Sequence, residues 1–393
     1  MSHQVTVSIN PSSAYLHIPF CRRRCFYCDF PVSVVGDRLR GESSGTISQY
    51  VEVLCQEINV TPSLGQPLET IFFGGGTPSL LSKNQLQRLV ETLKKRFGIL
   101  PSAEISMEMD PGTFDLAHLE GYRSAGVNRV SLGVQAFQEN LLQISGRSHS
   151  VSEIFTGVDL IRQVDIPEFS IDLISGLPHH TLDSWQESLE KAIAIAPTHI
   201  SVYDMTIEPG TAFGRYYKAG DQPLPADETT VKMYQMAEQV FKSAGYEHYE
   251  ISNYAQPGHQ CRHNRVYWEN RPYYGFGMGA ASYVEGKRFT RPRKKAEYYQ
   301  WVSDGCAIAC VETPPNEVLL ETLMLGLRLA EGVNLATLTE QFGKEKVAEI
   351  HKCCQPYYKK GWVEVVEGRL RLCDPQGFLF SNVVLADLFG ELG

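Results

Sequence analysis

Apolar and polar positions in the first 245 residues follow two alternating periods, one typical of strands and the other of helices. Short runs of apolar and β-branched residues predict six strands, at Ser13–Pro19, Leu68–Gly74, Ala103–Asp110, Arg129–Gln135, Phe169–Leu177 and His199–Thr206. Each is followed by a segment with apolar residues every three or four positions. These segments predict helices at Ser48–Thr61, Ser82–Phe97, Asp115–Ala125, Ser150–Val164, Leu182–Ala196 and Glu228–Ala244.

Six strand–helix units in succession indicate an α/β fold with a parallel sheet and right-handed crossovers. An open six-stranded barrel and a flat doubly wound sheet both fit this pattern. Functional sites of parallel α/β folds lie at the carboxyl ends of the strands. The sequence therefore predicts one site that combines residues from several strand ends, namely Gly74–Thr77, Glu108–Asp110, Gln135 and Asp172.

The pattern changes after residue 245. Tyr246–Tyr254 predicts one strand, and His263–Tyr283 is rich in aromatic residues and glycine without a helical period. From Pro314 onward, three helices and a β-hairpin indicate a winged-helix-like module, at Asn316–Leu329, Asn334–Phe342, Lys344–Lys359, Trp362–Val366 and Arg369–Cys373. We therefore predict a β/α barrel core (1–245), an aromatic linking region (246–313) and a C-terminal module (314–393).

Composition narrows the class of protein. The net charge of −9 argues against a nucleic-acid partner. The chain has no apolar run long enough to span a membrane, and its first residues lack the pattern of a signal peptide, so we expect a cytoplasmic protein. Ten cysteines in a reducing compartment are not expected to form a disulfide framework. Three of them fall within eight residues, which indicates metal binding.

The clustered cysteines are Cys21, Cys25 and Cys28, directly after the first predicted strand. Thiolates are the usual ligands of iron–sulfur clusters, and three of them would hold three irons of a [4Fe–4S] cluster and leave one open. The alternative is a zinc site with His17 or another side chain as the fourth ligand. Spacing alone does not separate the two.

The cysteine segment resembles the CxxxCxxC signature of the radical-SAM superfamily, including an aromatic residue before the last cysteine. Further stretches are similar to the coproporphyrinogen III oxidase-like (HemN/HemW) family: Gly74–Pro78, Leu132–Gln135, Asp172–Ile174, Gly176–Pro178 and Leu323–Arg328. The resemblance covers nearly the whole chain. It implies an open parallel (β/α)6 partial TIM-like barrel of the radical-SAM type, a [4Fe–4S] cluster, S-adenosylmethionine (SAM) and an electron donor for the cluster.

The resemblance also implies a set of SAM contacts. Glycines let the backbone approach a ligand, carboxylates accept hydrogen bonds from ribose hydroxyls or an ammonium group, and an arginine pairs with a carboxylate. The implied contacts are Tyr15, Tyr27, Gly75, Gly76, Thr77, Glu108, Gln135, Arg147 and Asp172.

Two departures from the oxidase pattern resemble the HemW branch, the haem chaperones. Phe30 stands where the oxidases have a further cysteine, and only fourteen residues precede Tyr15, where the oxidases have a longer arm. We therefore assign no catalytic residue. Cys261–Trp268 is similar to the HNxxYW motif of the HemW branch, which implies His263 as a haem ligand and Cys261 as a second candidate. The alternative for His263 is a hydrogen-bonded core residue.

These features predict a radical-SAM haem chaperone that binds haem and delivers it to acceptor haemoproteins, membrane-bound ones included. The first alternative is an oxygen-independent coproporphyrinogen III oxidase, which forms protoporphyrinogen IX in porphyrin biosynthesis. The second is a zinc-binding scaffold without catalytic activity.

Overall fold

A nine-stranded sheet forms the centre of the computed structural model, which describes residues 10–37, 40–308 and 313–393. The strand order is β11-β1-β4-β5-β6-β7-β8-β10-β9. Its six central strands are parallel and match the six predicted ones: β1 (Ser13–Ile18), β4 (Leu68–Gly75), β5 (Ile99–Met109), β6 (Arg129–Gln135), β7 (Glu168–Ser175) and β8 (His199–Asp204). The predicted α/β class with an open parallel sheet is confirmed.

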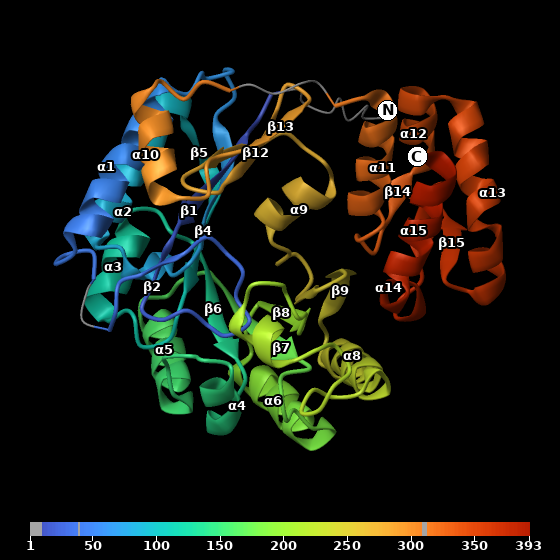
Figure 1. Ribbon diagram of the computed structural model, residues 1–393, viewed down its shortest axis with the longest axis horizontal. Helices are drawn as coiled ribbons and strands as arrows, with labels where there is room; N and C mark the ends of the chain where they lie inside the picture. The colour runs from blue at the N-terminus through green and yellow to red at the C-terminus, as the bar shows by residue number, and fades with distance from the viewer. Residues whose placement is uncertain (1–9, 38–39, 309–312) are drawn as a thin grey trace.

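Six helices connect or follow the parallel strands and lie along the outer side of the curved sheet (Figure 1). They are α1 (Gly45–Val60), α2 (Lys83–Phe97), α3 (Leu116–Ser124), α5 (Val151–Gln163), α6 (Leu182–Ile195) and α8 (Asp227–Ser243). Two shorter helices, α4 (Glu139–Ile144) and α7 (Ala212–Tyr216), and the 3-10 turn η1 (Pro78–Leu80) lie between them.

Helix α2 shows why a periodic sequence pattern predicts a helix correctly. Ser82 and Gln85 form a reciprocal capping box at its start, which satisfies backbone N–H groups that the helix leaves free. The apolar positions that predicted the helix, among them Leu86 and Leu93, are buried against the core. A helix with one apolar stripe is stable only where that stripe is covered.

The two edges of the sheet differ from the prediction. The segment predicted as one strand folds back as β9 (Glu247–Glu250) and β10 (Asn253–Ala255), which are antiparallel. In the turn, the Glu250 carboxylate accepts a hydrogen bond from the Ser252 amide at 3.1 Å, a contact that local sequence periodicity does not reveal. At the other edge, β11 (Tyr274–Phe276) pairs in parallel with β1.

A short helix, α9 (Arg262–Trp268), lies in the segment where the sequence showed no helical period. It packs against β4 and β5 (Figure 1). Its first turn is held by Glu104 of β5, whose carboxylate accepts hydrogen bonds from the Arg262 and His263 amides, both at 3.0 Å. Seven residues give too few repeats for a periodic signal, so tertiary capping rather than pattern fixes this helix.

The rest of the linking region adds the hairpin β12 (Ala281–Val284) and β13 (Lys287–Thr290) and helix α10 (Lys295–Ser303). Buried residues of this region, including Phe276 and Tyr298, belong to the same hydrophobic core as the barrel. The division at residues 245 and 313 stays a prediction, and residues 1–9 and 309–312 lie outside the described part.

The C-terminal module is built around a second hydrophobic core, to which Tyr234 of α8 also belongs. The three predicted helices are present as α11 (Pro315–Gly326), α12 (Leu335–Phe342) and α13 (Lys344–Lys360). The predicted hairpin is β15 (Val363–Val366) and β16 (Arg369–Leu372), to which β14 (Val333–Asn334) adds a third strand. Helices α14 (Gln376–Leu379) and α15 (Ser381–Leu392) were not predicted. No helix in the described ranges is long and apolar enough to cross a membrane.

Candidate functional site

The three clustered cysteines lie in one loop at the carboxyl end of β1. Cys21 ends the short strand β2 (Phe20–Cys21), which pairs with β3 (Ser33–Val34) and so closes the loop. The Cys28 amide donates to the Cys25 carbonyl at 3.2 Å, which forms a tight turn inside it. All three thiols are free and line a single cavity of about 510 Å³. Burial raises the pKa of Cys21 to about 12 and also raises that of Cys28.

Glycines at the end of β4 form the wall behind this loop. Gly75 has a φ of +113°, and a Cβ there would lie 2.4 Å from His17 Nδ1. A Cβ on Gly76 would lie 2.7 Å from the Phe20 carbonyl oxygen. Only glycine allows this close approach, so the local sequence is set by the packing of the cysteine loop.

Two carboxyl groups project into the cavity from β5 and β7, the strands on either side of β6. Glu108 accepts a hydrogen bond from the Gly75 amide at 2.9 Å, and burial raises its pKa to about 8. Both carboxylate oxygens of Asp172 lie within hydrogen-bond distance of the Ser131 hydroxyl, which donates one bifurcated hydrogen bond at 2.8 and 3.0 Å, and burial raises the pKa of Asp172 to about 6. A cationic or hydroxyl group of a bound ligand would favour the charged form of both carboxyl groups.

Arg147 lies between α4 and α5 and reaches across the cavity to the cysteine loop. Its Nη2 bonds to Asp110 Oδ1 at 2.5 Å and to the Gly133 carbonyl at 2.9 Å, and its Nη1 lies 3.4 Å from Cys25 Sγ. Asp110 belongs to the strand-end site that the sequence predicted within Glu108–Asp110, although it was not among the implied SAM contacts. The structure places it in the cavity, directly after β5.

Eight of the nine predicted SAM contacts line the cavity that holds the cysteines: Tyr27, Gly75, Gly76, Thr77, Glu108, Gln135, Arg147 and Asp172. Gln135 is held at a φ of +67°, a conformation uncommon outside glycine that occurs at functional sites. Tyr15 is the exception. It lines an inner chamber instead, and its hydroxyl is 3.1 Å from His17 Nδ1.

The residues fit an iron–sulfur cluster better than a compact zinc site. Both ring nitrogens of His17 are engaged, Nδ1 with Tyr15 and Nε2 with the Pro31 carbonyl at 3.2 Å, so His17 is not free to be the fourth ligand. Within the described ranges, no three Cys, His, Asp or Glu side chains converge where one ion could be held. Three thiols around a roomy, glycine-walled cavity leave space for a larger cluster and a second ligand.

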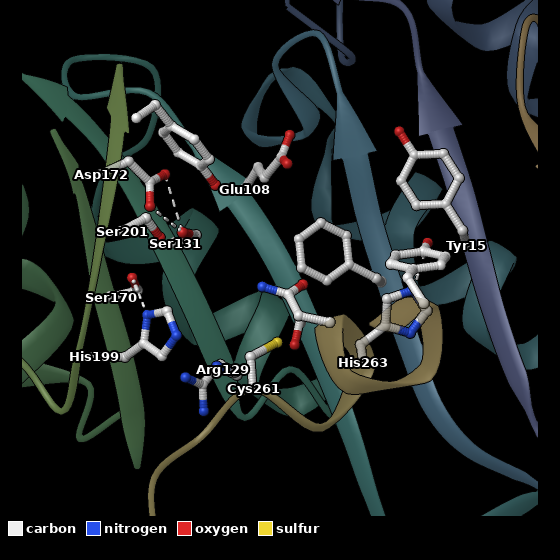
Figure 2. Close-up of a pocket in the computed structure, with 15 residues that line it drawn as sticks. Tyr15, Glu108, Arg129, Ser131, Ser170, Asp172, His199, Ser201, Cys261 and His263 are labelled. Carbon is white, nitrogen blue, oxygen red and sulfur yellow. Dashed lines mark hydrogen bonds between the residues drawn. The ribbon is translucent and has the colours of Figure 1, made fainter. Parts of the chain in front are cut away.

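The inner chamber, of about 200 Å³, shares Glu108 and Asp172 with the cysteine cavity. Figure 2 shows Cys261 and His263, both from the α9 segment, among the side chains that line it. Polar groups of the chamber wall are paired with one another, as Ser170 and His199 are at 2.8 Å.

His263 is fully buried in this chamber wall, with both ring nitrogens engaged. Nδ1 lies 2.8 Å from the Thr70 hydroxyl and Nε2 lies 2.9 Å from the Tyr267 hydroxyl. Burial lowers the pKa of His263 to about 3. Cys261 is also buried, with Sγ 3.6 Å from Glu104 Oε1, and burial raises its pKa to about 12. This is the environment of a core histidine, and haem ligation by His263 or Cys261 stays a prediction.

The open parallel β/α barrel and the three-cysteine loop at its mouth place this chain in the class of radical SAM proteins. The family model described as the Radical SAM superfamily matches residues 15–192, and that of the HemN C-terminal domain matches residues 313–380. Among solved structures, the radical SAM enzyme coproporphyrinogen III oxidase (HemN) from Escherichia coli is similar, with a TM-score of 0.81 and 25% identity. The match covers 96% of this chain and 90% of that one.

Sequence relatives narrow the class to one family. The heme chaperone HemW of Synechocystis sp. is 46% identical over 97% of both chains. The heme chaperone HemW of Bacillus subtilis is 34% identical over 97% of this chain and 100% of its own. The chain belongs to the HemW family, as the sequence motifs predicted.

Proposed function

We propose that this protein is a haem chaperone, which binds haem and delivers it to acceptor haemoproteins. The observation that carries the proposal is the 46% identity with the Synechocystis heme chaperone HemW, over nearly the full length of both chains. The cavity supports the chaperone over the oxidase at one position. Where the oxidase pattern has a further cysteine, this chain has Phe30, which lines the cavity and is 56% exposed.

In this proposal Cys21, Cys25 and Cys28 hold a [4Fe–4S] cluster, and SAM occupies the cavity beside it. When bound, the pair supplies one-electron chemistry that the protein's own side chains lack. Glu108 and Asp172 accept hydrogen bonds from the ligand, and Gly75 and Gly76 let its polar end approach the backbone. The cluster would need an external electron donor.

Haem needs more space than the inner chamber offers. A chamber of about 200 Å³ is smaller than the roughly 300–1,000 Å³ of common small-molecule sites, and haem is a large ligand among these. Ligation by His263 would therefore require α9 to move, and the nitrogen that binds the iron would lose its hydrogen bond to Thr70 or to Tyr267.

Haem titration followed by the Soret band tests the proposal. Wild-type protein should bind haem stoichiometrically, and His263→Ala should weaken binding if His263 is the ligand. His259→Ala is the matched control, because His259 lies four residues earlier, is partly exposed and pairs with Glu168 at 2.8 Å. Absence of stoichiometric binding by the wild type would refute the chaperone proposal. Equal binding by wild type and His263→Ala would remove only the assignment of the ligand.

The second candidate is oxygen-independent coproporphyrinogen III oxidase, which the structural similarity to HemN over 96% of the chain favours. An anaerobic assay with SAM and a reductant separates the two functions. The chaperone proposal predicts no multiple-turnover formation of protoporphyrinogen IX, and sustained turnover would establish the oxidase instead.

A further inference from the structure

Arg147 is placed to act on the cysteine loop. Its side chain is only 7% exposed, and its guanidinium spans from the Asp110 carboxylate to the Cys25 sulfur. The Nη1···Sγ distance of 3.4 Å is that of an N–H···S hydrogen bond. Among the three cysteines of the loop, Cys25 is therefore the one that has a buried cation against its sulfur.

Asp110 fixes this arrangement. Its Oδ1 accepts from Arg147 at 2.5 Å, and its Oδ2 accepts from the Thr77 hydroxyl at 3.1 Å. The Gly133 carbonyl accepts a second hydrogen bond from Arg147 Nη2 at 2.9 Å. The guanidinium is thus held directly by the end of β5 and by β6, and Asp110 is itself held by Thr77 at the end of β4. Its direction toward Cys25 does not depend on a ligand.

This geometry differs from that of a free arginine waiting for the carboxylate of a ligand. Nη2 is already committed to Asp110 and Gly133, and Nη1 faces sulfur. Nε has no hydrogen-bond partner in the part of the chain that the structure describes. This N–H remains free for a ligand, so the sulfur contact and the implied SAM contact of Arg147 do not exclude each other.

We propose that Arg147, positioned by Asp110, hydrogen-bonds the Cys25 thiolate when the cluster is bound and raises the reduction potential of that cluster. Hydrogen bonds to the ligand sulfurs and nearby charge both set the potentials of iron–sulfur clusters. Reduction adds one electron to the cluster, and a cation at contact distance in a buried site stabilises the added charge. The inference rests on the cluster site of the proposed function.

A potentiometric titration of the anaerobically reconstituted full chain, followed by electron paramagnetic resonance, tests this. Arg147→Met should shift the midpoint potential to a more negative value, and Arg147→Lys should lie between the methionine variant and wild type. Arg24→Met is the matched control. Arg24 is an exposed cation of the same loop whose Nη2 donates to the Phe30 carbonyl at 2.8 Å, so its loss should shift the potential less. An equal shift in the two methionine variants would overturn the role of the N–H···S bond.

The variant Asp110→Asn distinguishes two effects of Asp110 on the potential, its anchoring of Arg147 and its own negative charge. Removal of a nearby anion would by itself make the potential more positive, whereas loss of the arginine's anchor makes it more negative. We expect the negative shift, and a positive shift would overturn the positioning role of Asp110. If Arg147→Met loses its iron, the midpoint potentials of Asp110→Asn and Arg147→Lys are compared with that of wild type instead.

Iron and sulfide analysis of each preparation distinguishes the absence of the cluster from the absence of an effect of Arg147 on its potential. A wild-type protein without a four-iron centre would refute the cluster of the proposed function. A four-iron centre whose potential is the same in wild type, Arg147→Met and Asp110→Asn would refute only the present inference.

Discussion

The Arg291 guanidinium and the Glu57 carboxylate form an ion pair at 2.7 Å, with both side chains almost wholly removed from water. Glu57 lies on α1, and its second oxygen accepts from the Gly277 amide at 2.8 Å and from the Tyr298 hydroxyl at 2.6 Å. The network therefore ties α1 to the end of β11 and to α10, and attaches the linking region to the barrel.

Loss of one partner of this pair should destabilise the protein strongly. Glu57→Ala leaves the Arg291 charge buried without its partner, and we expect a loss of about 3–5 kcal/mol in the free energy of unfolding. Urea unfolding followed by circular dichroism measures it. The exposed pair of Lys346 and Glu349, at 2.9 Å, is the control, and Glu349→Ala should have little effect. Similar small losses in both variants would show that the buried pair is not important for stability.

The cysteines should divide into two groups by their effect on iron content. Serine at Cys21, Cys25 or Cys28 removes a ligand, so each variant should lose most of the iron that wild type retains after anaerobic reconstitution. Cys55→Ser is the matched control. Cys55 is a buried thiol on α1 whose sulfur accepts from the Thr92 hydroxyl at 3.5 Å, away from the cavity. Iron loss in this variant as large as in the loop variants would contradict the assignment.

Gly75→Ala should remove SAM binding through the backbone of the cavity wall. The new Cβ would lie 2.4 Å from His17 Nδ1, at a φ of +113° that L-residues rarely adopt. Gly65→Ala is the control that lacks the steric clash. Gly65 also has a positive φ, +86°, but a Cβ added there would meet no atom within 4 Å. Equilibrium binding of SAM to the reconstituted variants should be lost in the first and kept in the second. Equal affinities would exclude a role for close approach at Gly75.

The fold was predictable where one segment's pattern contains all the information. The six parallel strands follow from their apolar runs, and the bounds of β6 are those predicted from the sequence. Helix α9 was not predictable in this way. Its seven residues are held by Glu104, which is 158 positions from Arg262 along the chain, so only the tertiary structure brings the cap to the helix.

The site shows the same division. The cysteine spacing and the strand-end residues identified one cavity, because parallel strands place their carboxyl ends together. The sequence did not distinguish Tyr15, which lines the inner chamber, from the residues of the cysteine cavity. It also gave no indication that Arg147 is already bonded to Asp110, since 37 residues separate the two.

Glu108 should make the stability of the ligand-free protein depend on pH. Its pKa is about 8 in the folded state and near 4.5 when the chain is unfolded, because burial disfavours the charged form. The folded state therefore binds the proton more tightly, and the resulting stabilisation is present below about pH 4.5 and is lost as pH rises through about 8. The shift corresponds to a loss of stability on the order of 5 kcal/mol across this pH range, and most of this loss should be absent in the neutral variant Glu108→Gln. Unfolding free energies of wild type and Glu108→Gln should thus differ in slope between about pH 5 and pH 9. Parallel curves would show that Glu108 ionises in the fold as readily as in the unfolded chain.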